Sequence, residues 1–419
     1  MYSSKISLKS NMNKNERKMS NIQHEALEQF KRQLYDILTP YDTDVQLMKW
    51  LRARNFNLKK AEALFREMYC CRQIYELDTI EKNYVKPEVL EKYEYNGHIG
   101  IAKNGTPIRY IAMGRGDNLG FLKSVSGYGI CIYASYIMQL DLNLMRKESE
   151  RTGREINEVT YIFDMDEFAV QDNLYKSLIE TGLDLGHIVQ EYYPEIWSNV
   201  FFINAPTIFD KMFNLFKPVF KLTLLEKVQF VDREHTPELL LKYIDEDVLP
   251  EFLGGKRRDS KGDPKCREFL RFGGKIPEEY YLCHRPLLLP SDPGASSVVI
   301  GARSCFNYSV IVRKPGSRLS IEFRTEGASI YLIMLYRKFG LDPNVPDIPA
   351  SDEYLDEKAE KSNVQLVSPG LRVQSHFAPV EDKCTAAWPG IYIFKFDNTS
   401  SWFMSKRLIY RIRVLEPEL

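Results

Sequence analysis

The hydrophobic pattern along the chain changes twice, and these changes predict three structured segments. Between about residues 22 and 78, apolar side chains such as Leu27, Phe30 and Leu34 recur at helical spacing. Between about 85 and 256, short apolar runs alternate with longer amphipathic runs, which is typical of a mostly parallel sheet covered by helices. After a charged linker the period becomes two, which predicts an antiparallel β-sandwich over about 275–416. The expected fold is therefore multidomain: an all-α module, an α/β domain and a β-sandwich.

Local signals place the helices of the first segment. Thr39-Pro40 ends the first helix, Asp42 or Thr43 can cap the second, and Asn57 can cap the third. The helices are short and need something to pack against. Residues 1–21 are polar, and we expect them to form a disordered tail.

In the second segment, Asn104-Gly105 predicts a hairpin turn ahead of a strand. The expected strands lie at 108–113, 159–163, 200–203 and 228–231, and the expected helices at about 125–147, 170–190 and 239–244. In the third segment, strands are expected at 297–300, 308–312, 319–323, 330–335, 391–396 and 408–414, with a long loop at about 338–362.

Charge and cysteine usage narrow the function. Lysine plus arginine and aspartate plus glutamate number 57 each, whereas a nucleic-acid binder usually has a basic excess. The seven cysteines show no CxxC spacing, which argues against a disulfide framework or a zinc site and favours reduced thiols in the cytoplasm. No apolar run is long enough to span a bilayer.

Two motifs suggest enzyme chemistry. Gly114-Arg115-Gly116 lacks the third glycine of a dinucleotide fingerprint at the required position. The acidic run from Asp164 to Glu167 follows a strand and can either hold Mg²⁺ or form a solvated, capping turn; the second reading is favoured because no phosphate loop accompanies it. GxSxG and HExxH are both absent. We therefore expect a binding protein without catalytic residues, cofactor or metal; an enzyme acting through Asp164 and Asp166 stays a third reading.

The segment 192–231 is the most informative part of the chain. Its apolar run is denser than one buried helical stripe requires, and lysines interleave with it. One reading is an ordinary core helix with a solvated lysine face. The other is a gate that covers an apolar cavity in water and inserts into lipid at a membrane, with lysines meeting anionic headgroups. The gate residues would be Phe209, Met212, Phe213, Phe216 and Phe220, and the membrane-contacting cations Lys211, Lys217 and Lys221.

Several motifs together resemble the CRAL-TRIO family of lipid-binding proteins, which includes the phosphatidylinositol transfer proteins. They are Tyr193-Pro194-Glu195, Asn204-Ala205-Pro206, Phe216-Lys217-Pro218 and Pro250-Glu251-Phe252-Leu253-Gly254-Gly255. The stretch 47–56 resembles the helical N-terminal module of the same family, and the sandwich is similar to a GOLD domain. This three-part order is similar to that of the supernatant protein factor (α-tocopherol-associated protein) group, and it spans roughly residues 22–416.

The resemblance implies a lipid cavity between the sheet and the helix near 207–222, which would act as a mobile gate. In phosphoinositide-binding members a glutamate, a lysine and an arginine contact the headgroup, and they match Glu195, Lys227 and Arg54. Ile196 departs from the family pattern, which often has arginine there. The implied domains are a helical module at 22–78, a lipid-binding domain at 85–256 and a GOLD sandwich at 275–416.

The expected function is an intracellular lipid carrier for a phosphoinositide or an isoprenoid such as tocopherol or squalene. Phosphatidylcholine is a poorer candidate, because acidic residues stand where its binders carry hydroxyls. We expect a cytoplasmic protein that visits endomembranes transiently and binds no nucleic acid. The alternative is a lipid-sensing adaptor that docks onto membranes or Golgi partners through its sandwich.

Overall fold

The computed structural model describes residues 21–169, 175–206, 209, 213–214, 217, 220–338 and 364–416. The expected tail, almost in full, and nearly all of the expected loop at 338–362 lie outside these residues. The chain divides into two compact units, one ending at Phe65 and one beginning at Arg66. The division falls inside a helix, ahead of the expected module boundary near residue 78.

The first unit is helical. It contains α1 (Asn21–Leu34), α2 (Asp44–Ala53) and the first half of α3 (Leu58–Ile74). The Oγ1 of Thr43 and the Oδ1 of Asn57 each accept a hydrogen bond from a backbone N–H three residues ahead, which confirms these two as helix caps. The ring of Phe65 packs edge-on against Phe30 and Trp50, with centroids 6.0 and 5.2 Å away.

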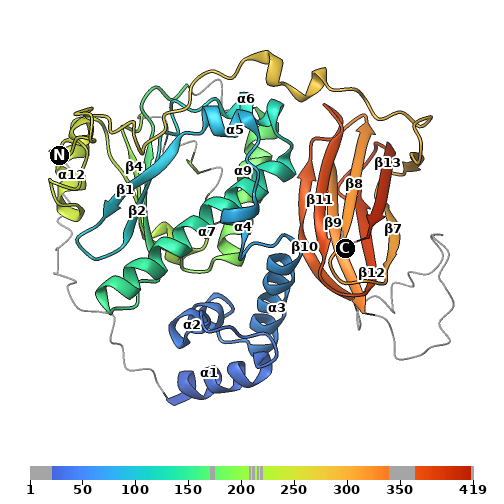
Figure 1. The fold of residues 1–419 in the computed structure, drawn as a ribbon, viewed down its shortest axis with the longest axis horizontal. Helices are drawn as coiled ribbons and strands as arrows, with labels where there is room; N and C mark the ends of the chain where they lie inside the picture. Colours follow the sequence, from blue (N-terminus) through green and yellow to red (C-terminus); the bar gives the residue numbers. More distant parts are fainter. Residues whose placement is uncertain are drawn as a thin grey trace. The chain divides into compact units, whose positions relative to one another are not determined.

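The second unit begins with an α/β layer structure (Figure 1). Its five-stranded sheet has the strand order β1-β2-β3-β4-β5; β1 and β2 form the expected antiparallel hairpin, and β2 to β5 are parallel. The strands are β1 (Asn96–Ile101), β2 (Pro107–Ile111), β3 (Val159–Asp164), β4 (Trp197–Ile203) and β5 (Val228–Phe230). The helices are α4 (Ile80–Asn83), α5 (Glu88–Tyr93), α6 (Asn118–Ser124), α7 (Gly127–Thr152), α9 (Lys176–Tyr192), α11 (Leu222–Leu225) and α12 (Thr236–Tyr243).

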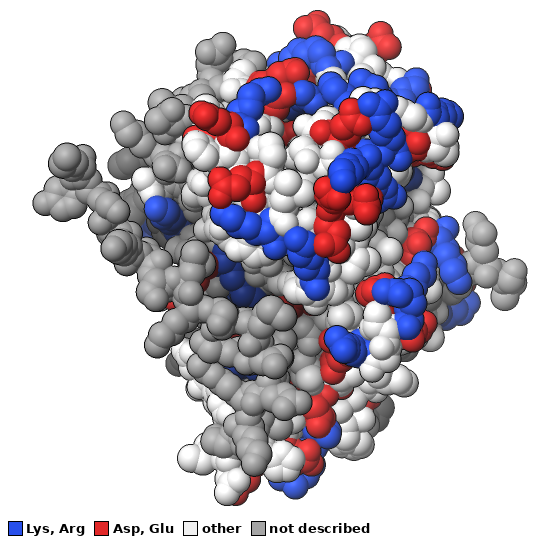
Figure 2. Space-filling model, turned by 90° about the vertical axis from the view of Figure 1, so that its left-hand side faces the viewer, with Lys and Arg blue, Asp and Glu red and all other residues white. Residues whose placement is uncertain are grey.

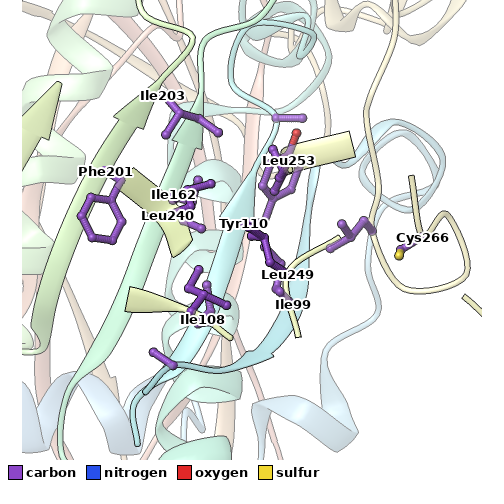
Figure 3. Packing of buried hydrophobic residues seen from close by; sticks show 14 residues of the cluster. Ile99, Ile108, Tyr110, Ile162, Phe201, Ile203, Leu240, Leu249, Leu253 and Cys266 are labelled. Carbon is purple, nitrogen blue, oxygen red and sulfur yellow. The ribbon is translucent and has the colours of Figure 1, made fainter. Parts of the chain in front are cut away.

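One face of the sheet packs against α12 and the chain that follows it (Figure 3). Ile108 and Tyr110 of β2, Ile162 of β3 and Phe201 of β4 alternate with residues that point to the other face, as the two-residue period requires. Short 3-10 helices at η2 (Glu251–Leu253), η3 (Glu278–Tyr280) and η4 (Leu282–His284) follow α12.

The charged linker does not separate two cores as expected. Directly after it, Cys266 and Leu270 are 0% and 1% exposed and belong to the same cluster as Ile108. Leu270 also forms a β-bridge with Gly97 of β1. The α/β layer therefore extends past residue 256, because the chain after the charged residues returns to cover the sheet.

A charge network centred on the fully buried Asp141 lies on the opposite face, between β2 and α7. The Nε of Arg109 donates to Asp141 Oδ1 at 3.0 Å, and His98 Nε2 lies 2.9 Å from the same oxygen. The hydroxyl of Tyr161 donates to the other oxygen at 2.5 Å. Burial alone would raise the pKa of Asp141, but Arg109 and His98 outweigh it and hold that pKa below its usual range.

The C-terminal part contains two antiparallel four-stranded sheets, drawn orange to red in Figure 1. Their strand orders are β10-β9-β12-β7 and β11-β8-β13-β6. The strands are β6 (Ser296–Ile300), β7 (Cys305–Val312), β8 (Ser317–Glu326), β9 (Ile330–Lys338), β10 (Val364–Val373), β11 (Val380–Ala386), β12 (Gly390–Asp397) and β13 (Lys406–Leu415).

Sequence patterns predicted six of these strands and missed two. β10 contains Pro369-Gly370, which reads as a turn, and its register shifts on both sides of Ser368. β11 is a short edge strand with Glu381, Asp382 and Lys383 in its first half, so its sequence does not alternate between apolar and polar residues.

Basic and acidic side chains are interspersed on the face shown in Figure 2. Paired charges such as Lys256–Glu246 and Arg258–Glu251 agree with the zero net charge of the chain. Among the described residues, no helix is both long enough and apolar enough to cross a bilayer.

The buried ion pair predicts a specific stability defect. Asp141→Asn leaves Arg109 buried and uncompensated, so unfolding free energy should fall by about 3–5 kcal/mol. The double variant Arg109→Met/Asp141→Leu should recover most of that loss, because it buries no unpaired charge. Because the pKa of Asp141 is lowered by folding, wild-type stability from this pair should persist above pH ~4 and be lost below it. Urea unfolding of the three proteins measures this; equal stability of Asp141→Asn and wild type would contradict it.

Candidate functional site

A row of three phenylalanine rings crosses the face of the sheet that is turned toward α7. Phe163 of β3 is paired in register with Phe202 of β4, and Phe202 with Phe230 of β5. Their ring centroids are 4.9 and 5.1 Å apart, and both pairs are stacked. Because the strands are parallel and in register, these three residues form one continuous apolar surface, which we call the aromatic row.

The described residues of the expected gate lie against the aromatic row. Phe209 and Phe213 are 8% and 6% exposed, and their rings are 5.3 and 5.5 Å from Phe202. Phe220 stacks on Phe213 at 5.9 Å. Three of the five expected gate residues are therefore brought together; Met212 and Phe216 lie outside the described residues.

The cations expected to meet a membrane behave differently from one another. Lys217 is exposed, as that expectation requires. Lys221 instead pairs with Glu191 at 3.3 Å, and its backbone N–H donates to Gln190 Oε1 at 2.7 Å. Lys211 lies outside the described residues. The pairing of Lys221 ties the end of the expected gate segment, near 207–222, to α9.

Two of the expected headgroup residues lie near the amino ends of neighbouring strands. The ammonium of Lys227 donates to the backbone oxygen of Trp197, two residues after Glu195, and to Glu158 Oε1 at 2.9 Å. Lys227 and Glu158 are each 30% exposed. Glu195 has a left-handed backbone conformation, with φ of 51°. The structure thus places Lys227 against the start of β4, which follows the Tyr-Pro-Glu motif, and adds an acidic partner that the sequence did not indicate.

Arg54, the third expected headgroup residue, belongs to the first compact unit. It directly follows α2 and precedes two residues with left-handed backbones, Asn55 and Phe56. Its Nη1 donates to the oxygen of Ala53 at 3.2 Å. These contacts all lie within the first unit. The role of Arg54 in a headgroup site stays a prediction.

The carboxylates of the acidic run at the end of β3 form hydrogen bonds and ion pairs with other side chains of the protein. Asp164 is 3% exposed and accepts hydrogen bonds from Tyr110 at 2.6 Å and from Asn204 at 2.7 Å. Asp166 pairs with Arg115 and Arg233, and Glu167 pairs with Arg115 at 3.0 Å. Across the part of the chain that the structure describes, no cluster of His, Cys, Asp or Glu has the arrangement of a metal site. These carboxylates fix the turn that leads out of β3.

A small cavity lies away from the aromatic row. It measures about 20 Å³, room for roughly one water molecule, and its wall includes Tyr75, Tyr128, Ser135, Tyr193 and Leu371. It is far too small for a lipid. The expected lipid site is instead the region between the aromatic row and the gate segment, where aromatic side chains are now in contact.

The comparisons with known proteins agree with this architecture. The family described as the CRAL/TRIO domain matches residues 91–255, which include the whole five-stranded sheet. Residues 91–255 form a CRAL/TRIO domain. Such a domain supports a lipid-binding function for this chain.

Similar proteins extend beyond the CRAL/TRIO domain. Protein ctg-1 of Caenorhabditis elegans is 24% identical over 371 residues, which are 88% of this chain and 91% of ctg-1. Protein real-time of Aedes aegypti is 27% identical over 271 residues, 63% of this chain but 40% of that longer protein. Among solved structures, Sfh5 has a TM-score of 0.45 and 15% identity, over 59% of this chain and 90% of Sfh5.

Sequence reasoning singled out Phe209, Phe213 and Phe220 but missed the surface beneath them. Phe163 and Phe202 were assigned to strands, yet their shared face depends on a register that one sequence does not contain. A usable signal was present: Tyr161 and Phe163 stand two apart, as do Val228 and Phe230. Glu158 carried no signal, because it precedes its strand among other polar residues.

Proposed function

We propose that this chain is an intracellular lipid carrier whose CRAL/TRIO domain binds a hydrophobic ligand over the aromatic row. The observation that carries the proposal is the contact of Phe209 and Phe213 with that row, with Phe220 stacked on Phe213. A ligand tail would take their place on the sheet while the gate segment moves to the membrane. The stacked rings then provide an apolar surface in both states.

Apolar transfer free energies explain why such a carrier needs no catalytic residue. Burying one methylene is worth about 0.8 kcal/mol, so a 16-carbon tail would cost roughly 12 kcal/mol to expose to water. Spontaneous desorption from a bilayer is therefore slow. A protein that offers an apolar surface at the membrane removes much of this barrier, and no covalent bond changes.

We also propose that Lys227 selects ligands with a phosphorylated headgroup. Its ammonium is half-buried and already faces one carboxylate, Glu158. An incoming phosphate would replace or share that partner and gain charge-assisted hydrogen bonds. Because Glu158 competes for the same ammonium, the site would bind phosphoinositides moderately and still accept a neutral isoprenoid such as tocopherol or squalene.

The remaining parts of the chain fit this function as follows. We propose a helical module at 22–78, a lipid-binding domain at 85–256 with its core continued by the following segment, and a GOLD domain at 275–416. All seven cysteines are free thiols, which suits a reducing cytoplasm. The carrier would visit endomembranes transiently.

The headgroup proposal predicts opposite effects for two neighbouring substitutions. Lys227→Ala should weaken phosphoinositide binding roughly 10- to 150-fold, the worth of a charge-assisted contact to phosphate, and leave tocopherol binding unchanged. Glu158→Gln should strengthen phosphoinositide binding up to about fivefold, since it removes the competing charge. Competition titrations with both lipids measure these effects. Equal losses for both ligands in Lys227→Ala would show damage to the fold, and no loss for either would exclude Lys227 from the site.

The gate proposal predicts that Phe213 matters more for transfer than for stability. Phe213→Ala should slow vesicle-to-vesicle lipid transfer several-fold at a nearly constant melting temperature, because the gate leaves the sheet in the working cycle. Phe201→Ala is the matched control, since Phe201 is 0% exposed on the opposite face of the same strand pair. It should cost about 3–5 kcal/mol of folding stability, with normal transfer per folded molecule.

Paired measurements of melting temperature and transfer rate separate the alternatives. If Phe213→Ala destabilises the protein as much as Phe201→Ala and transfer falls only in proportion, the segment is an ordinary core helix. If the wild-type protein holds lipid stably and exchanges none between vesicles, the carrier proposal fails in favour of a lipid-sensing adaptor.

A further inference from the structure

Four loops meet at one end of the C-terminal sandwich: 301–304, 327–329, 374–379 and 398–405. Hydrogen bonds hold each of them to a neighbouring loop or strand end. The N–H of Arg303 donates to the backbone oxygen of Ser401 at 3.0 Å. The N–H of Thr325, near the end of β8, donates to the backbone oxygen of Ser375 at 3.2 Å. Lys406 Nζ donates to the oxygen of Ser329. We call these segments the tip loops.

The tip loops expose four large apolar side chains to water. Trp402, Phe403 and Met404 are consecutive and are 68%, 93% and 54% exposed, and Phe377 of a neighbouring loop is 55% exposed. Single exposed hydrophobic residues are ordinary on protein surfaces, but three in succession at a loop tip with a fourth nearby are not. Such a group marks a surface that another apolar phase covers.

Hydrogen bonds fix the loop that bears these side chains. Asn398 is 0% exposed, and its Nδ2 donates to the oxygens of Gly301 and Met404 at 2.9 Å each. The Oγ of Ser401 donates to Met404 at 2.9 Å as well. These bonds hold the loop in a defined arrangement in which Trp402, Phe403 and Met404 stay exposed.

The charge pattern of the tip loops fits one kind of partner. The four loops contain one arginine, one histidine and no carboxylate. The guanidinium of Arg303 lies 4.2 Å from the centre of the Trp402 ring. Glu326, which ends β8, is neutralised by Arg324 at 3.2 Å and Arg407 at 3.8 Å. A surface with aromatic rings, a cation and no uncompensated acid complements the anionic headgroup region of a bilayer.

We propose that the tip loops insert Trp402, Phe403 and Met404 into the interface of an anionic lipid bilayer. The indole would lie at the headgroup level, the level that tryptophan favours, and Phe403 would reach the acyl boundary. Arg303, stacked on the indole, would contact lipid phosphate. This contact is distinct from the gate. It rests on the proposed carrier function only in that lipid transfer would give it a role, since the tip would bind lipid whether or not the sheet holds a ligand.

Vesicle binding of the full chain tests the proposal. On vesicles of phosphatidylcholine with phosphatidylserine, the affinity of Trp402→Ser/Phe403→Ser should be lower than that of wild type by at least about tenfold. Val85→Ser/Leu287→Ser is the matched control, because it removes two apolar side chains that are 88% and 51% exposed elsewhere, and it should bind normally. Arg303→Gln should lose affinity for these vesicles but not for phosphatidylcholine alone. All variants should keep the wild-type melting temperature, since the substituted side chains are exposed.

Fluorescence reports the insertion directly. Trp402 is the exposed one among four tryptophans, so binding to vesicles should shift its emission to the blue, and bromine-labelled lipids should quench it. Trp402→Phe should bind nearly as well and show neither change. Equal vesicle binding by the tip variant and the matched control would overturn the proposal, as would an emission unchanged by vesicles. Normal insertion without lipid transfer would instead contradict the carrier function and leave this inference intact.

Discussion

The second compact unit depends on keeping the aromatic row out of water. Phe163, Phe202 and Phe230 stack across three parallel strands and cannot turn away, because strand pairing fixes their direction. Phe209 and Phe213 shield them. A parallel sheet normally buries both faces under helices. Here Phe209 and Phe213 bury part of one face, the part that the proposed lipid tail would cover in their place.

The two faces of the sheet are held by different kinds of contact. Toward α12, a continuous aliphatic and aromatic cluster fixes the sheet, and the segment around Cys266 closes it. Toward α7, the pair of Arg109 and Asp141 fastens that helix with charge-assisted hydrogen bonds that tolerate little movement. The aromatic row lies on this second face, where Phe209 and Phe213 contact it through apolar rings. Such contacts can be exchanged for those of a lipid without leaving a buried charge unpaired.

Much of the fold could be predicted from the sequence, because period and turn chemistry are local properties. The hairpin at Asn104-Gly105 and the cap at Asn57 need only neighbouring residues and were predicted correctly, and Thr43 was one of the two caps expected for the second helix. The missed strand β10 is interrupted by Pro369-Gly370, and its pairing is with residues far away in sequence. The return of Leu270 to the sheet after a charged stretch was missed for the same reason.

The candidate site was less predictable, since it depends on which side chains meet. Phenylalanine density pointed to Phe209, Phe213 and Phe220, whereas the stacked rings beneath them follow from register between strands up to about 40 residues apart in sequence. The pairing of Lys227 with Glu158, rather than with a neighbour such as Glu226, likewise joins two strand ends. Residue type suggested an apolar binding region, whereas the structure was needed to identify which side chains meet there.

Native mass spectrometry of the full chain purified from its own cells tests the central claim most directly. If the aromatic row holds a lipid tail, the spectrum should contain a one-to-one complex whose added mass is released as a phosphoinositide or an isoprenoid. Incubation with vesicles that carry an isotope-labelled form of that lipid should then replace the bound molecule. A protein that is free of lipid as purified, and that takes up none from vesicles, would contradict the account.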